Sequence, residues 1–100
     1  MQLEKNRRGR ELRLVLSGEL DHHNAAIIRE EVDRELDGSI KLLTLDMSGI
    51  TFMDSSGIGV VLGRYRRMSE SGGKLRMGGM SIYAEKILRM AGVLALLERK

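Results

Sequence analysis

The sequence predicts an α/β domain whose β-sheet is mostly parallel beyond its first strands. Short apolar runs alternate along the chain with segments of helical periodicity, and this order is typical of β-α-β units. The first two strand-like segments follow each other directly, whereas the later ones are separated by helices. A length of 100 residues suits one domain with a single core.

The composition excludes several classes of protein. The chain is 42% hydrophobic and 31% charged, and no apolar run approaches the ~18 residues that a membrane span needs. The first residues are charged with no apolar run behind them, so we expect no signal peptide. Because the chain has no cysteine, thiolate and disulfide chemistry are excluded, and we expect a cytoplasmic protein.

The first two strands are predicted at residues 1–5 and 12–17. The second segment has leucine at every second position, as expected for a strand with one face on the core. These leucines are Leu12, Leu14 and Leu16. Gly18 is predicted to end this strand and to open a polar loop that runs to Asn24.

The first helix is predicted to begin at Asn24, its expected N-cap, and to end at Asp37–Gly38. Its apolar positions should face the sheet: Ala25, Ile28, Val32 and Leu36. Residues 40–47 are almost continuously apolar, which predicts a central strand that is buried on both faces. Ser48–Gly49 is then predicted to turn the chain.

The second helix is predicted from about Ser56 to Ser69. Its apolar positions follow helical spacing: Ile58, Val61, Leu62, Tyr65 and Met68. A strand at residues 74–77 and a turn at Gly78–Gly79 should follow. Together with the central strand, these helices predict a core that is centred on Leu43, Leu45, Ile58, Val61, Leu62 and Leu88.

The third helix is predicted to be capped by Ser81 and ended by Gly92. The residues predicted on its core face are Ala84, Ile87, Leu88 and Ala91. Residues 93–97 form a last apolar segment, for which we expect either a short strand or a docked tail.

The segment from Met53 to Gly59 joins the central strand to the second helix. It places two hydroxyls, Ser55 and Ser56, beside the carboxylate of Asp54. A helix N-terminus offers unpaired N–H donors and the positive end of the helix dipole, so this junction suits an anion such as phosphate. Aspartate and serine are equally typical of a helix cap, and the two interpretations are compatible.

The motifs of catalysis and cofactor binding do not fit. Ser55 and Ser56 lack the preceding glycine of a nucleophile elbow, and the glycines of the second helix are spaced G-x-G-x-x-x-G, unlike a dinucleotide fingerprint. Asp21, His22 and His23 have no defined common face for a metal. We therefore expect no catalytic residue, no cofactor and no metal; a site of modification or docking remains.

Three segments resemble the anti-sigma factor antagonists of the STAS family. They are Gly18–Ala25 (GELDHHNA), Phe52–Val60 (FMDSSGIGV) and Leu62–Tyr65 (LGRY). The similarity keeps the same order through essentially the whole chain, which is therefore identified as one STAS domain over residues 1–100. The resemblance implies a small mixed β-sheet with helices packed on one side.

The resemblance also implies a function. The protein would not be an enzyme; it would bind an anti-sigma factor that is an ATP-dependent serine kinase, and so release a sporulation-type sigma factor. The kinase would phosphorylate the serine matching Ser56, the second of the pair, to switch binding off, and a serine phosphatase would reverse this. The expected partner-binding residues are Asp21, His22, His23, Asp54, Ser55, Ser56, Gly57, Gly59 and Arg64.

Two other functions remain open from the sequence. STAS-like domains also occur as small-ligand or nucleotide-sensing modules, although no phosphate-cradling loop is found here. Weak nucleic-acid binding would use the arginines around Arg64. However, the net charge is only +3 and aromatic residues are 3% of the chain, so we expect neither direct nucleic-acid binding nor membrane binding.

Overall fold

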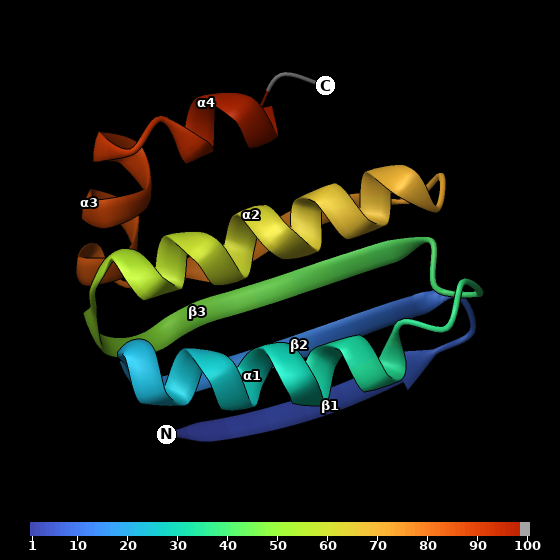
Figure 1. The fold of residues 1–100 in the computed structure, drawn as a ribbon, viewed down its shortest axis with the longest axis horizontal. Coiled ribbons are helices and arrows are strands. Elements are labelled where there is room, and N and C mark those ends of the chain that lie inside the picture. The colour runs from blue at the N-terminus through green and yellow to red at the C-terminus, as the bar shows by residue number, and fades with distance from the viewer. Residues whose placement is uncertain (99–100) are drawn as a thin grey trace.

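The computed structural model describes residues 1–98, which form a four-stranded sheet in the order β1-β2-β3-β4 (Figure 1). The strands are β1 (Gln2–Arg8), β2 (Glu11–Leu20), β3 (Leu42–Met53) and β4 (Lys74–Met80). The helices are α1 (His22–Glu35), α2 (Ser55–Glu70), α3 (Ile82–Met90) and α4 (Val93–Glu98). β1 is antiparallel to β2, whereas β2, β3 and β4 are parallel. The predicted small mixed sheet is confirmed.

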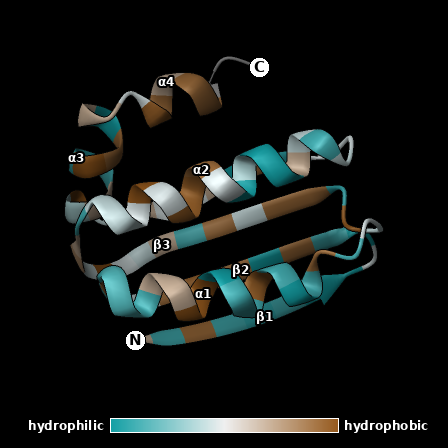
Figure 2. Ribbon diagram, in the orientation of Figure 1, coloured by the Kyte–Doolittle hydropathy of each residue, from teal (hydrophilic) through white to brown (hydrophobic). Residues whose placement is uncertain are grey.

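Helices α1 and α2 lie side by side over one face of the sheet (Figure 1). Figure 2 shows that β1 is largely hydrophilic, whereas β3 carries a long hydrophobic stretch. Four of the predicted core residues are buried: Leu43, Leu45, Val61 and Leu88. The other two, Ile58 and Leu62, are only partly buried and pack against this core.

The second strand is longer than the sequence predicts. Gly18 does not end it, because β2 continues to Leu20. Gly18 has a φ of +103° and its α-carbon lies against the backbone of Met1, where a Cβ would come within 3.0 Å. Glycine suits this position for two reasons. It adopts this φ without strain, and its missing side chain leaves room for the backbone of Met1.

The first helix is capped by Asp21, so the predicted Asn24 cap is wrong. Asp21 Oδ1 accepts a hydrogen bond from the Asn24 N–H at 2.9 Å, and the Asn24 side chain donates to the carbonyl oxygen of Glu19 at 2.8 Å. His22 and His23 consequently form the first turn of α1 instead of a polar loop. The helix ends at Glu35, close to the predicted Asp37–Gly38 stop.

The turn predicted at Ser48–Gly49 is wrong, because both residues lie inside β3. The Asp46 carboxylate accepts hydrogen bonds from the Ser48 N–H at 3.0 Å and from the Ser48 hydroxyl at 2.6 Å. A Cβ on Gly49 would come within 2.8 Å of the Ser17 Cβ, and the β2–β3 register shifts beside Ser17. The turn-forming residues thus mark an irregularity in a continuing strand.

We predict that Asp46→Asn lowers stability in a pH-dependent way. The hydrogen bonds from Ser48, with a further contribution from Arg13, hold the pKa of Asp46 below its ordinary value of 3.8. A depressed folded-state pKa stabilises the protein above the unfolded pKa, and this contribution is lost as the pH falls through the folded pKa. Urea unfolding should show a loss of about 1 kcal/mol at neutral pH. The difference should shrink below a pH of about 4; a constant difference under acidic conditions would contradict the assignment.

The last third of the chain departs from the sequence prediction at two places. β4 runs through Gly78–Gly79 to Met80, so the predicted turn is wrong. Residues 93–97, for which a short strand or a docked tail was predicted, belong to helix α4. Val93, Leu94 and Leu97 of this helix are buried against the core. A short apolar run does not distinguish a strand from a buried helix. The cap at Ser81 and the stop at Gly92, with a φ of +78°, are confirmed.

Candidate functional site

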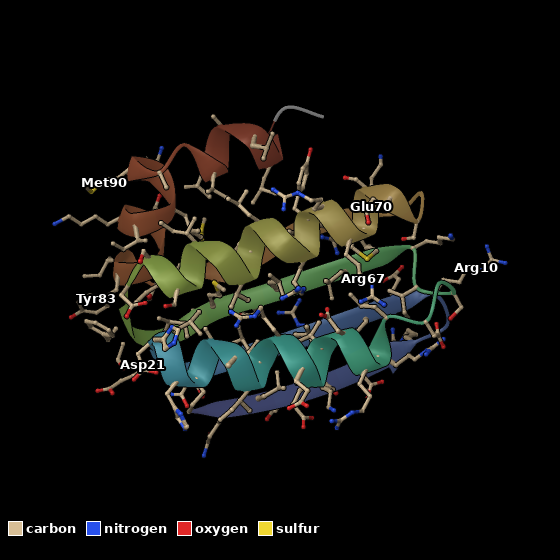
Figure 3. All side chains as sticks on the ribbon, viewed as in Figure 1. Arg10, Asp21, Arg67, Glu70, Tyr83 and Met90 are labelled. Carbon is tan, nitrogen blue, oxygen red and sulfur yellow. The ribbon has the colours of Figure 1, made fainter. Side chains whose placement is uncertain are left out.

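Three helix N-termini gather at one edge of the sheet, where the parallel strands end. α1 follows β2, α2 follows β3 and α3 follows β4, and their N-caps are Asp21, Asp54 and Ser81. Figure 3 shows Asp21 and Tyr83 at this end of the molecule, and Arg10 and Glu70 at the opposite end. Segments that are far apart in sequence therefore form one surface, as expected for loops that follow parallel strands.

The two aspartate caps directly follow neighbouring strands of the sheet. Leu20 pairs with Met53, and the Asp54 N–H donates to the Leu20 carbonyl oxygen at 3.4 Å, so the chain leaves both strands at the same level. The Asp54 Oδ1 accepts from the Ser56 N–H at 2.8 Å, as Asp21 does at the start of α1. Each carboxylate thus stabilises a helix end and adds negative charge to this surface.

The serine pair opens α2, and its two members differ in exposure. Ser55 is exposed, whereas Ser56 is partly buried. Gly57 is buried, and a Cβ on it would come within 2.6 Å of the Met53 side chain. The absence of a side chain at Gly57 allows the first turn of α2 to rest on the end of β3, and Ser55 lies exposed on this turn.

The remaining predicted residues of α1 and α2 at this end are accessible. His22 and His23 are exposed on the first turn of α1, and Gly59 is exposed on α2 with open space around its α-carbon. Within the described part of the chain, no cluster of three histidine, aspartate or glutamate side chains could hold a metal ion.

Arg64 does not lie on this surface, although the sequence analysis placed it among the partner contacts. Its side chain is 8% exposed, and its Nε lies 3.1 Å from the Asp33 Oδ1, as an ion pair without hydrogen-bond geometry. A second guanidinium nitrogen donates to the Asp33 Oδ2 at 3.3 Å. Arg64 therefore links α2 to α1, and its burial leaves little of the guanidinium for a partner.

Sequence reasoning missed the exposed apolar side chains of α3 near this surface. Ile82 is 74% exposed, Tyr83 52% and Met90 75%, and Figure 3 shows Tyr83 and Met90 at the same end as Asp21. All three fall outside the helix face that carries the buried Ala84 and Leu88. An apolar residue outside the predicted core face is the sequence signal that could have identified them. Exposed apolar side chains beside a polar site are typical of a protein-binding surface.

A family model for the STAS domain matches residues 2–99 of this chain. The chain belongs to the STAS family. The anti-sigma F factor antagonist of Paenibacillus polymyxa is 33% identical over 94 residues, which cover 93% of this STAS chain and 80% of that protein. None of the helices in residues 1–98 combines the length and apolar character needed to cross a membrane.

Solved structures of the anti-sigma factor antagonist SpoIIAA share the fold of this STAS domain. The unphosphorylated form has a TM-score of 0.82 and 28% identity, covering 92% of this chain and 82% of that chain. The phosphorylated form, described as a Bacillus cell fate determinant, has a TM-score of 0.75 and 27% identity, covering 94% and 86%. The family membership that the sequence predicted is confirmed.

Proposed function

We propose that this STAS domain is a non-enzymatic anti-sigma factor antagonist that is switched by serine phosphorylation. It binds an anti-sigma factor with serine kinase activity, and this binding releases a sporulation-type sigma factor. The observation that carries the proposal is the exposed serine that follows the Asp54 cap at the start of α2, on the surface that also carries the Asp21 cap of α1. The similarity to named anti-sigma F factor antagonists supplies the class of partner.

The proposed contact surface is the end of the molecule where α1, α2 and α3 begin. Asp21, His22 and His23 contribute polar groups from α1, and the serine pair with Gly59 contributes a small, open surface from α2. From α3, Ile82 and Tyr83 would add the apolar area that protein interfaces bury at their centre. ATP belongs to the partner, so the domain itself needs no cofactor, and neither nucleic acid nor membrane is a direct partner.

The phosphorylated residue belongs to the Ser55–Ser56 pair. The family resemblance points to Ser56, whereas the exposure of the two side chains favours Ser55, because a kinase must bring the hydroxyl into its own active site. Incubation with the anti-sigma kinase and ATP, followed by phosphosite mapping, tests the proposal. Phosphate on either serine supports the switch and identifies its position; phosphate on neither contradicts it.

We predict that Asp21→Ala and Asp21→Ser both weaken binding to the anti-sigma factor about tenfold, because each removes a carboxylate from the contact surface. The two variants differ in stability. Serine keeps an N-cap oxygen for the Asn24 N–H, whereas alanine loses the cap at a cost of about 1 kcal/mol. Calorimetry measures the affinity and thermal melting measures the stability. If Asp21→Ser binds like the parent, Asp21 is a helix cap and not a contact.

A further inference from the structure

The outer face of the sheet, which lies opposite α1 and α2, carries a row of polar side chains. The strand register places Asn6, Arg13, Thr44 and Arg76 side by side across all four strands. These positions alternate with the leucines that face the core, such as Leu12 and Leu43. The proposed partner surface lies at the end of the strands, so this row is a separate feature of the molecule.

Arg13 and Arg76 are the register neighbours of Thr44 on the two adjoining strands. Arg13 reaches across β3, because a Cβ on Gly78 in β4 would come within 3.2 Å of one of its guanidinium nitrogens and 2.9 Å of the Thr44 Cγ2. On β4 itself, a guanidinium nitrogen of Arg76 lies 3.4 Å from the Thr44 hydroxyl. The missing side chain at Gly78 provides the space in which Arg13 lies.

A hollow of about 500 Å³ opens over this row, and it is a size that fits a small ligand. Its polar lining is Lys5, Asn6, Arg7, Arg8, Glu11, Arg13, Thr44 and Arg76. Four arginines, a lysine and an amide supply N–H donors, and Thr44, a buried residue, supplies an O–H donor.

The charge of the hollow is positive after its internal ion pair is counted. Arg13 is paired with Asp46 at 2.6 Å, and Lys5 and Arg7 are paired with carboxylates outside the lining. No carboxylate of the described residues lies within ion-pair distance of Arg8 or Arg76. Glu11 is the acidic residue of the lining. Two unpaired guanidinium groups against one carboxylate favour an anion, and the planar fork of arginine matches the oxygens of a phosphate.

We propose that this outer-face hollow binds a small ligand that carries a phosphate group. Arg76 and Arg8 contact the phosphate oxygens, the Thr44 hydroxyl donates to one of them, and Arg13, fixed by Asp46, borders the site. The site goes beyond the proposed anti-sigma function, because it uses neither the serine pair nor the helix N-termini.

Inorganic pyrophosphate is the probe for the test, and amide NMR of the complete chain at low ionic strength is the readout. We expect saturable shifts at the amides of Thr44, Arg76 and Gly78, and unchanged signals at Ser55 and Ser56. Arg76→Gln should weaken binding about tenfold, as for one charge-assisted contact, and Thr44→Val should weaken it while keeping nearly the same side-chain shape.

Arg66→Gln is the matched control, because it removes the same charge from an exposed position on α2. It should leave the affinity for pyrophosphate unchanged, and acetate should bind far more weakly than pyrophosphate. Shifts that map to the start of α2, an equal loss of affinity in Arg66→Gln, or shifts that never saturate would overturn the site. Acetate binding as tightly as pyrophosphate would overturn its preference for phosphate. Because no partner protein is present, the result is independent of the anti-sigma proposal.

Discussion

Phosphorylation of the serine pair should abolish binding to the anti-sigma factor and leave the domain folded. The local effects on stability are small and oppose each other. The N-terminus of α2 favours an anion by about 0.3–1 kcal/mol, whereas the nearby Asp54 carboxylate repels it, with screening because Ser55 is exposed. The native fold is therefore expected to survive the modification.

The partner surface experiences a much larger effect. An interface that accepts a small hydroxyl would have to desolvate a phosphate of about −1.5 to −2 charge. An unpaired buried charge costs several kcal/mol, and about 1.4 kcal/mol corresponds to a tenfold change in affinity. A loss of affinity of at least about a hundredfold is therefore expected.

Aspartate and alanine variants at both serines measure this switch. The aspartate variant at the phosphorylated position should lose more affinity for the partner than the aspartate variant at the other serine. Both Ser55→Asp and Ser56→Asp should melt near the parent temperature. The alanine variant at that position should bind the partner and resist phosphorylation. Ser69→Asp, an exposed change at the far end of α2, is the matched control for added charge. A phosphorylated protein without native circular dichroism would contradict the mechanism.

Leu45→Ala should destabilise the domain by roughly 2–5 kcal/mol. Leu45 is fully buried in the central strand, between β2 and β4, so the cavity that alanine leaves is enclosed on all sides. Urea or thermal unfolding measures the loss, which corresponds to a fall in melting temperature of at least about 8 °C for a domain of this size.

Ile82→Ala is the control for the Leu45 experiment. It removes a comparable apolar side chain that is 74% exposed, so the stability should change by less than about 0.5 kcal/mol. Equal unfolding midpoints for the parent and Leu45→Ala would show that β3 is not the centre of the core.

The sequence was sufficient to predict the elements that a local pattern determines. The alternating leucines of β2, the apolar run of β3 and the stripes of α1 to α3 identified the layers and most of the core. Ser81 and Gly92 were correct as helix signals because each acts through its own backbone neighbours. The serine junction was likewise predictable, since it depends only on a strand being followed by a helix.

Local sequence patterns failed where contacts between distant parts of the chain determine the structure. Asp21 and Asn24 are both good capping residues, and Asp21 is the cap because β2 stays paired with β3 up to Leu20. Ser48–Gly49 looks like a turn, yet the hydrogen bonds of Asp46 and the packing on Ser17 keep it within a strand. The periodicity of the sequence predicts neither the β2–β3 pairing up to Leu20 nor the packing of Gly49 on Ser17.

Of the core positions predicted on α2, Val61 and Met68 are buried, whereas Ile58, Leu62 and Tyr65 are only partly buried. The helix also buries Gly57, Val60 and Arg64. The hydrophobic pattern missed Gly57 and Arg64 because glycine and arginine do not count as apolar residues. Arg64 enters the interior only because Asp33 of α1 supplies its counter-charge, and this pairing requires the tertiary structure.

The hydrophilic strand β1 has a consequence for self-association. It pairs with β2 along one edge, so its other edge presents backbone N–H and C=O groups that could extend the sheet into a second molecule. Four of its seven residues, Glu4, Lys5, Arg7 and Arg8, are charged. In an antiparallel pairing centred on Lys5, two ammonium groups would face each other, and like charges directly opposite are destabilising. The sequence of β1 thus protects the domain from strand-to-strand aggregation when it accumulates to high concentration.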